Sequence, residues 1–306
     1  MAIDSDAETN GEMGEAGSDL GTRLERTRGR PPCAGSIEAF RRAVVEHYRG
    51  HGRDLPWRRT RDPYAILVSE VMLQQTQVPR VIPKYEEFLA SFPTVLDLAR
   101  ATIAEVLCVW QGLGYNRRAL ALQKAAQSIV TDHSGLVPDS PALLRALPGI
   151  GPATAAAVCV FSYDRPLVFI ETNIRAAYIH FFFQECVSIP DAAILPLVEL
   201  TLDREQPRDW YYALMDYGAW LKRSRPNPGR RSRHHTMQTP FAGSHRQLRA
   251  EILRLLLAEA PESLTPAEVN ARPLPFAAAE PDIAAILDEL AAEGFLVRDD
   301  GRYSVA

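Results

Sequence analysis

The sequence predicts a mainly α-helical protein that carries a second, smaller domain at its C-terminal end. Between residues 36 and 221, apolar residues recur at helical spacing, and capping residues or prolines stand where the segments begin. The strand-like run at 166–170 is too short to imply a sheet. After residue 243, three helical segments precede two short β-type runs that flank Asp299-Asp300-Gly301, a typical hairpin turn. We therefore expect a helical domain over 36–221 and a winged-helix-like domain over 243–306.

Each predicted helix has a local justification. Ser36 can cap the first one, whose apolar face includes Phe40 and Val44. Thr94, Thr102 and Thr265 are capping residues of short helices, and Gly294 is a typical helix C-terminus. The other predicted helices cover residues 63–77, 81–91, 116–133, 141–146, 153–162, 244–260 and 281–293. The winged-helix pattern could serve DNA binding or protein–protein contact, since the would-be recognition helix is acidic.

Composition limits the class of protein. A chain of 306 residues with 46% hydrophobic residues is typical of a soluble protein with two ordinary domains. The net charge of -4 gives the whole chain no basic signature. Four widely separated cysteines predict reduced, mostly buried thiols rather than disulfides or a metal cluster. Because we find no apolar run of 18 residues and no secretory signal, we expect a cytoplasmic protein.

Two segments outside these domains have unusual composition. Residues 1–35 are acidic and rich in Gly and Ser before they turn basic, which predicts a disordered tail. Residues 222–242 are predicted to form a basic linker, because 222–235 contain six Lys or Arg, no acid, two prolines and a glycine. This segment is either a solvated connection or a strap in which Arg230, Arg231 and Arg233 bind phosphates.

The helix that follows Asp62-Pro63 is nearly all apolar, so we expect it to be buried on most sides. Glu70, Gln74 and Gln77 fall at i, i+4 and i+7, which would place them on one helix face. A carboxyl group among apolar neighbours is expensive to ionise, so its pKa should be raised. Glu70 is therefore a candidate general acid, and the alternative is an ion pair with an arginine elsewhere in the chain.

Three further motifs carry candidate chemistry. Pro148-Gly149-Ile150-Gly151 lies between two helices, where glycines let backbone N–H groups hold a phosphate, and this predicts a helix–hairpin–helix. Glu171 and Asn173 precede an apolar helix, whose N-terminus should keep the Glu171 carboxylate ionised. A neutral Glu70 and a charged Glu171 would separate acid and electrostatic roles, although Glu171 could simply cap its helix.

The loop around Tyr115 is the last of these motifs. Gly112 and Gly114 flank an aromatic residue, and Arg117 and Arg118 follow it. Such a loop could push a wedge into a base stack while arginines hold the DNA backbone. It could equally be a glycine-rich turn with a core tyrosine.

Taken together, these motifs resemble adenine DNA glycosylases of the MutY type, which belong to the helix–hairpin–helix superfamily with endonuclease III. The resemblance covers residues 36–222. It rests on Leu55-Pro56-Trp57-Arg58, Asp62-Pro63-Tyr64, Ser69-Glu70-Val71-Met72-Leu73-Gln74-Gln75-Thr76-Gln77, Trp110-Gln111-Gly112-Leu113-Gly114-Tyr115 and Leu147-Pro148-Gly149-Ile150-Gly151.

The resemblance implies a two-lobed helix–hairpin–helix glycosylase fold and excision of adenine paired with guanine or 8-oxoguanine. It implies that Glu70 protonates the departing purine, that a carboxylate at Glu171 stabilises the cationic sugar, and that Asn173 lies beside this sugar. A monomer that acts on double-stranded DNA with no cofactor is expected, and a monovalent cation can bind the hairpin backbone. The implied DNA contacts are Gln74, Gln75, Gln77, Tyr115, Arg117, Arg118, Gly149, Gly151 and Thr154.

The sequence departs from the family at several positions. Glu171 replaces the family's catalytic aspartate, and Ala153 replaces a tyrosine; since lyases of this superfamily use a lysine there, no β-lyase activity is expected. Lys222 stands where the first cysteine of the family's iron–sulfur cluster would be, so no cluster is expected. The C-terminal segment differs from the usual domain that senses 8-oxoguanine. Two rival hypotheses therefore stay open: a glycosylase for hypoxanthine or mismatched uracil or thymine, and a catalytically inactive lesion-recognition or transcription-regulating protein.

Overall fold

The computed structural model describes residues 33–237, 240–274 and 282–306, which form two compact units. The first unit joins Met1–Asp54 to Tyr163–Met237, and the second unit joins Leu55–Ser162 to Gln238–Ala306. Each unit is therefore built from two stretches that are far apart in the sequence. The helical region predicted at 36–221 is divided between the units, and the C-terminal segment belongs to the second. Of the predicted N-terminal tail, residues 1–32 lie outside the described residues.

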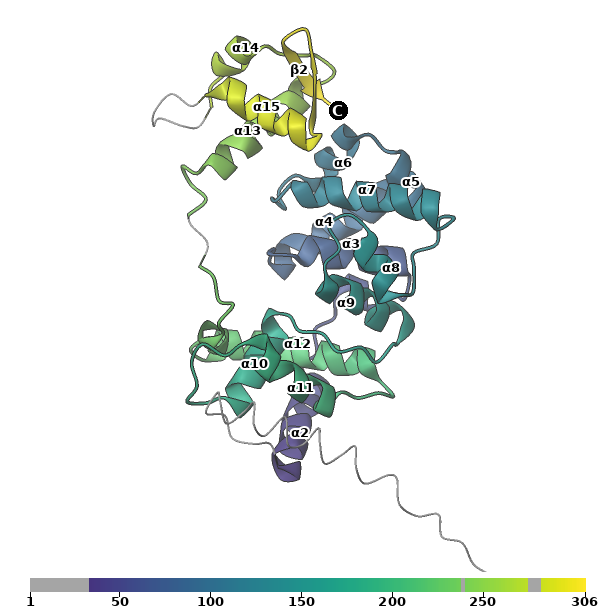
Figure 1. Cartoon of the computed structure of the whole chain (residues 1–306), viewed down its shortest axis with the longest axis vertical. Coiled ribbons are helices and arrows are strands. Elements are labelled where there is room, and N and C mark those ends of the chain that lie inside the picture. The colour runs from purple at the N-terminus through teal and green to yellow at the C-terminus, as the bar shows by residue number, and fades with distance from the viewer. Residues whose placement is uncertain (1–32, 238–239, 275–281) are drawn as a thin grey trace, which may run out of the picture. The chain divides into compact units, whose positions relative to one another are not determined.

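The first unit is a group of helices (Figure 1). Its core is rich in aromatic side chains. Phe40 is buried, and its ring centroid lies 4.9 Å from that of Tyr178 and 5.1 Å from that of Phe182. The elements of this unit are α2 (Ala34–His51), α10 (Thr172–Phe182), α11 (Asp191–Thr201), α12 (Pro207–Ser224) and the 3-10 helix η2 (Pro228–Arg231). α12 packs against both α2 and α10, which places the N-terminal helix on elements more than 100 residues later in the chain.

The second unit holds most of the remaining helices and the hairpin. Thr94 and Thr102 accept hydrogen bonds from Asp97 and Glu105 backbone nitrogens, as the predicted capping boxes require. The elements are η1 (Pro56–Arg58), α3 (Pro63–Leu73), α4 (Val78–Ser91), α5 (Val95–Arg100), α6 (Ile103–Trp110), α7 (Arg117–Asp132), α8 (Pro141–Ala146), α9 (Pro152–Tyr163), α13 (His245–Glu259), α14 (Pro266–Asn270), α15 (Ile283–Glu293), β1 (Leu296–Asp299) and β2 (Arg302–Val305).

α3 is the buried helix that the sequence predicts, but it ends earlier than expected. The Asp62 carboxylate accepts hydrogen bonds from Tyr64 and Ala65 nitrogens, so the predicted start is confirmed. The helix ends at Leu73, and Gln75 has a left-handed φ of 54°. The prediction that Glu70, Gln74 and Gln77 share one helix face is therefore wrong. Pro79 is one reason, because a proline there cannot donate to the Gln75 carbonyl of a continued helix.

The basic segment at 222–242 is less irregular than the predicted linker. Its first residues, through Ser224, continue α12, and Pro228–Arg231 form η2, which packs on α10. Ile189 and Ser232 form an isolated parallel bridge that ties the segment to the first unit. The prolines end α12 as predicted, but the segment then packs against the first unit through residue 233.

The C-terminal segment has the predicted elements in the predicted order. Helices α13, α14 and α15 precede an antiparallel hairpin in which Leu296 pairs with Val305 and Asp299 with Arg302. Buried side chains of Ile252 and Leu287 contribute to its core. Gly294 ends α15 with a left-handed φ of 91°, as predicted. The predicted start of this third helix at residue 281 lies outside the described residues.

The prediction that the four cysteines are mostly buried is only half correct. Cys159 and Cys186 are buried, as expected, whereas Cys33 and Cys108 are exposed. All four thiols are free. Within the described ranges, none of the helices combines the length and apolar character that crossing a membrane requires.

Candidate functional site

Glu70 is the one residue between Tyr64 and Met72 of α3 that is not buried. Its neighbours Ser69 and Val71 are 1% and 3% exposed, whereas Glu70 is half-buried. The carboxyl group therefore stands at the edge of an apolar helix, close enough to the surface to meet a ligand. This position suits a proton donor that must be reached by a substrate.

The hairpin and the end of α3 come together within the second unit. Gln74 donates from Nε2 to Thr154 Oγ1 of α9 at 3.3 Å. Both residues are predicted DNA contacts, and a cleft of about 280 Å³ beside them is lined by Val71, Gln74 and Gly149. The predicted contacts Gln75 and Gln77 are exposed and lie between α3 and α4.

The turn between α8 and α9 needs glycine at one of its two positions for structural reasons. Gly149 has a left-handed φ of 74°, and a Cβ added there would lie 2.6 Å from the Cβ of Ala121. Gly151 is different, because a Cβ added there meets no atom of the protein within 4 Å. The space over Gly151 is thus open to a ligand that approaches the backbone closely.

The predicted wedge loop has a fixed shape. The Tyr115 side chain is 38% exposed, and its backbone has a left-handed φ of 50°. Gly112 and Gly114, which precede it, are also left-handed, and α7 begins two residues after it. The Trp110 Nε1 donates to the Gly114 carbonyl at 3.1 Å, and Arg118 donates to the same oxygen at 3.0 Å. The Tyr115 ring is covered on one side by the Arg118 guanidinium, 5.5 Å from the ring centroid. An exposed aromatic side chain is therefore held on a preorganised backbone.

Arg118 caps the C-terminal end of α3, a role that the sequence did not predict. Its Nη1 donates to the carbonyls of Val71, Met72 and Gln74 at 2.8, 2.8 and 2.6 Å, which caps the last turn of α3. Burial of the guanidinium lowers the pKa of Arg118 to about 10. These bonds explain why α3 ends at Leu73, and they occupy the side chain that we expected on the DNA backbone.

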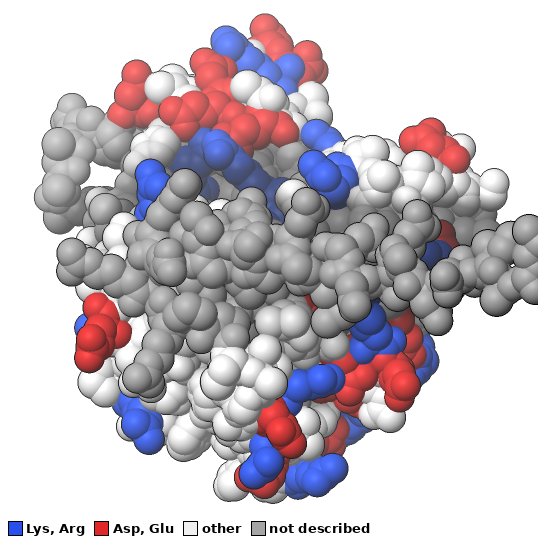
Figure 2. Space-filling model, turned by 60° about the horizontal axis from the view of Figure 1, so that its bottom comes forward, with Lys and Arg blue, Asp and Glu red and all other residues white. Residues whose placement is uncertain are grey.

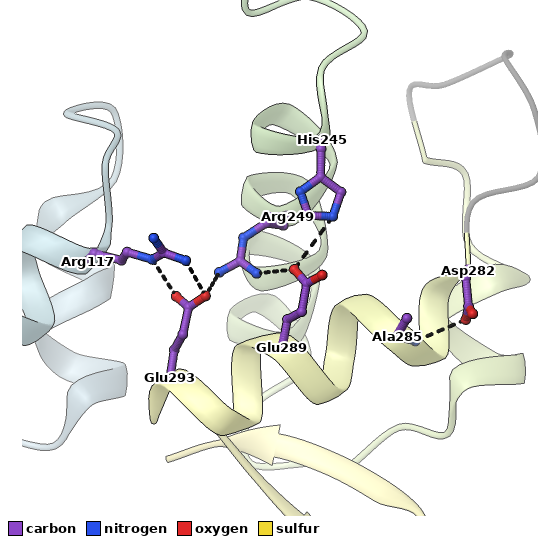
Figure 3. Close-up of polar contacts among 7 residues, drawn as sticks. All are labelled: Arg117, His245, Arg249, Asp282, Ala285, Glu289 and Glu293. Carbon is purple, nitrogen blue, oxygen red and sulfur yellow. Dashed lines mark hydrogen bonds and ion pairs between the residues drawn. The ribbon is translucent and has the colours of Figure 1, made fainter.

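Arg117, the other predicted backbone contact in this loop, pairs with an acid of α15 (Figure 3). Its Nε and Nη2 donate to the two carboxylate oxygens of Glu293 at 2.8 and 2.6 Å. The hydrogen bond from Arg117 lowers the pKa of the Glu293 carboxyl group. A cleft of about 730 Å³ lies beside this pair and is lined by residues of the wedge loop and of α13, including Tyr115, His245 and Arg249.

Glu171 in the first unit is the N-cap of α10. Its Oε1 accepts hydrogen bonds from the backbone nitrogens of Asn173 and Ile174, both at 2.8 Å. Its Oε2 accepts from Thr172 Oγ1 at 3.1 Å and from Asn173 Nδ2 at 3.2 Å. The alternative interpretation as a cap is thus correct in geometry. It is compatible with a catalytic role, because a helix N-terminus also stabilises a carboxylate.

Lys222 lies within electrostatic reach of the Glu171 carboxylate. Gly218 of α12 contacts the backbone of Asn173 so closely that an added Cβ would lie 2.0 Å from its oxygen. Lys222 follows four residues later on the same face of α12. Burial lowers the pKa of the Lys222 ammonium, and the charge of Glu171 opposes this effect. Helical spacing links Lys222 to Gly218, but only the structure places α12 against Glu171.

The arginines of the basic segment divide into two kinds. Arg231 donates to carbonyls at the end of α10, among them Phe183 and Gln184, and to Ile179 at 3.2 Å. It therefore stabilises a helix C-terminus. Arg230 and Arg233 are exposed. Of the three arginines predicted to bind phosphates, these two therefore remain candidates.

Charge over the visible surface is mixed. Figure 2 shows Lys and Arg interspersed with Asp and Glu on the described part of one face. The described part of this face therefore carries both signs of charge. The described ranges contain no group of three or more His, Cys, Asp and Glu side chains arranged to hold a metal ion.

Comparison with known proteins identifies the class. Residues 68–228 match the family model described as "HhH-GPD superfamily base excision DNA repair protein". The chain therefore belongs to the HhH-GPD superfamily, and the helix–hairpin–helix at α8 and α9 lies inside the matched region. Within the superfamily, the chain belongs to the MutY-type branch.

The relatives that define this branch are named adenine DNA glycosylases. The Mycobacterium tuberculosis protein is 34% identical over 286 residues, which cover 86% of this chain and 92% of that protein. The Rattus norvegicus protein is 35% identical over 195 residues, but these cover 60% of this chain and only 38% of the rat protein. A solved thermostable thymine-DNA glycosylase aligns with a TM-score of 0.54 and 25% identity over 60% of this chain and 87% of that structure.

Proposed function

We propose that the protein is a monofunctional DNA N-glycosylase of base excision repair that hydrolyses the bond between the sugar and a mispaired purine, adenine opposite guanine or 8-oxoguanine. The single observation that carries this proposal is the position of Glu70, a half-buried acid on an otherwise buried helix. Relatives across 86% of the chain are adenine DNA glycosylases, which favours adenine as the base.

Two carboxyl groups divide the chemistry. Glu70 donates a proton to the adenine ring, because a neutral purine leaves far more readily than an anionic one. Glu171 stays charged at the N-terminus of α10 and stabilises the positive charge that develops on the sugar while water attacks. Asn173 holds the Glu171 carboxylate through its side-chain amide and its backbone nitrogen.

DNA recognition is assigned to neighbouring elements of the second unit. Tyr115 enters the base stack as a wedge, and the flipped adenine becomes accessible to Glu70. Gly149 and Gly151 hold a phosphate through backbone N–H groups, and carbonyl oxygens of the hairpin backbone can bind an alkali cation. Gln74 and Thr154, which are already hydrogen-bonded to one another, contact the lesion region together with Gln75 and Gln77.

One observation favours a second candidate function, a glycosylase for another mispaired base. One solved structure of similar fold is a thymine-DNA glycosylase at 25% identity. In this chain Ala153 is an exposed small residue at the start of α9, and Glu171 is longer than the family's aspartate. Because Ala153 has no amine, a Schiff base cannot form at that position, so strand cleavage by β-elimination is not part of either candidate function.

The test is an excision assay on a panel of duplexes. Each duplex carries one lesion: adenine opposite guanine or 8-oxoguanine, hypoxanthine opposite thymine, or uracil or thymine opposite guanine. Base release is measured after alkaline cleavage of the abasic product, with Glu171→Asp in parallel. We expect the wild type to release adenine fastest. Preferential release of thymine or uracil would support the second candidate, and no release from any duplex would exclude both.

A further inference from the structure

The carboxylate of Glu293 lies between two arginines that come from different elements (Figure 3). Arg117, the first residue of α7, donates to both of its oxygens at 2.8 and 2.6 Å. Arg249 of α13 donates from Nη2 to Oε1 of the same carboxylate at 2.7 Å. Two guanidinium groups thus converge on one anionic group in a geometry that arginines also use for phosphate.

The two arginines differ in how firmly they are held. The Arg249 side chain is 14% exposed and also donates from Nη1 to Glu289 at 2.7 Å, while His245 lies 3.6 Å from the same glutamate. The Arg117 side chain is 75% exposed. An ion pair made by so exposed an arginine is weak, because water and salt screen it. Arg249 is therefore preorganised, and Arg117 can exchange its partner.

Arg117 and Arg249 lie close to the residue that is proposed to enter the DNA base stack. Arg117 follows the wedge residue Tyr115 by two positions, and both line the same 730 Å³ cleft as His245 and Arg249. If Tyr115 enters a base stack, the phosphates of that segment must pass close to the first turn of α7. Because the backbone of double-stranded DNA carries a phosphate about every 1.7 Å along its axis, a phosphate will be available to these arginines.

We propose that Arg117 and Arg249 form a binding site for a DNA phosphate, and that Glu293 occupies this site when DNA is absent. This inference rests on the proposed function only for its ligand, double-stranded DNA. The acidic helix α15 then acts as a competitor: each binding event exchanges the Glu293 carboxylate for a phosphodiester. The C-terminal domain thereby contributes Arg249 to DNA binding while one of its acids limits affinity.

The direction in which Glu293→Gln changes duplex affinity distinguishes two roles for Glu293. If Glu293 competes with DNA, Glu293→Gln should tighten binding to any duplex, since it removes the negative charge that Arg117 and Arg249 share. If Glu293 is instead a brace that holds the domain for DNA binding, the same change should weaken binding. The neighbouring pair of Glu251 and Arg254 on α13, joined at 2.8 Å, provides matched controls with the same charge changes.

The experiment measures the Kd of the full chain for an undamaged fluorescent duplex by anisotropy over a series of salt concentrations. The variants are Glu293→Gln, Arg249→Ala, Arg249→Lys and the double change, with Glu251→Gln and Arg254→Ala as controls. We expect Glu293→Gln to bind about two- to fivefold more tightly than Glu251→Gln. Arg249→Ala should bind more weakly than Arg254→Ala and lower the salt slope by about 1. Arg249→Lys should fall between wild type and Arg249→Ala, because lysine keeps the charge but not the fork.

Specific results would overturn the phosphate site. Glu293→Gln that binds no more tightly than Glu251→Gln contradicts it, as does tightening by Glu293→Gln that is undiminished when Arg249→Ala is added. Thermal unfolding of each variant shows whether weaker DNA binding only reflects a destabilised domain. If it does, the affinity of the double variant is compared with that of Arg249→Ala alone. A wild type that binds duplex and excises adenine in parallel assays would leave the proposed function intact even if these results are negative. A wild type that neither binds nor excises would remove both proposals.

Discussion

Glu171 carries one methylene more than the aspartate that the family resemblance places there. The structure shows how that length is used: the carboxylate folds back onto the start of α10 and accepts hydrogen bonds from Asn173 and Ile174 nitrogens. The sequence predicted the cap, because Glu-Thr-Asn before an apolar run is a local signal. It could not predict Lys222 beside this carboxylate, since that approach depends on α12 passing Asn173 at Gly218.

At the residue scale we predict that Lys222→Met stabilises the protein at neutral pH. Burial lowers the pKa of folded Lys222 below its ordinary value of about 10.4, so the folded state disfavours the charge. Below the folded pKa the lysine is charged in both states, so the penalty is fully present there. As the pH rises through the folded pKa, the penalty declines, and it is absent above the unfolded pKa.

Thermal unfolding at pH 7 and near pH 10 measures this effect. The midpoint of Lys222→Met should exceed that of the wild type at pH 7, and the difference should shrink at the higher pH. Arg223→Met, a change at the exposed neighbouring residue, should show no such trend. A less stable Lys222→Met protein at pH 7 would instead mean that attraction to Glu171 outweighs burial.

At the scale of elements, local signals predicted several helix starts but not that of α2, which begins at Ala34 with Cys33 rather than Ser36 at its N-cap. They also failed at one important helix end. Asp62, Thr94 and Thr102 cap their helices as expected, because the capping side chain and its partners are sequence neighbours. The end of α3 was predicted wrongly because its cap, Arg118, comes from α7 and is 45 residues beyond Leu73. Arg231 is a second example. It was predicted to bind a phosphate, but its side chain donates hydrogen bonds to carbonyls at the end of α10.

The helix–hairpin–helix allows an element-scale prediction that separates folding from binding. Gly149→Ala should destabilise the protein by about 2 kcal/mol, because alanine disfavours the left-handed backbone and its Cβ would crowd Ala121. Gly151→Ala should leave the unfolding midpoint nearly unchanged, since its Cβ would meet no protein atom within 4 Å. The same Cβ would block close approach of a phosphate to the backbone.

Chemical denaturation and duplex binding, measured on both variants, test this prediction. We expect Gly151→Ala to bind undamaged duplex about tenfold more weakly while it remains as stable as the wild type. Wild-type affinity in a stable Gly151→Ala protein would show that the hairpin does not hold DNA through its backbone.

At the scale of the whole molecule, the chain folds into units that its linear order does not show. The sequence indicated a helical region followed by a C-terminal domain, and the elements of both were largely correct. The structure joins the C-terminal domain to residues 55–162 and the N-terminal helix to residues 163–237. Such pairings depend on contacts distant in sequence, which periodicity and capping do not encode. The expectation of two lobes came from the family resemblance and not from local patterns.

Glu70 belongs to the second unit, and Glu171 belongs to the first. The central claim is that Glu70 protonates the departing base, and it is tested by single-turnover release of adenine from a duplex with adenine opposite 8-oxoguanine, with duplex affinity measured on the same samples. We predict that Glu70→Gln, which preserves size and removes the proton, lowers the rate about 10³-fold with affinity unchanged. Adenine release by Glu70→Gln at the wild-type rate would contradict the account.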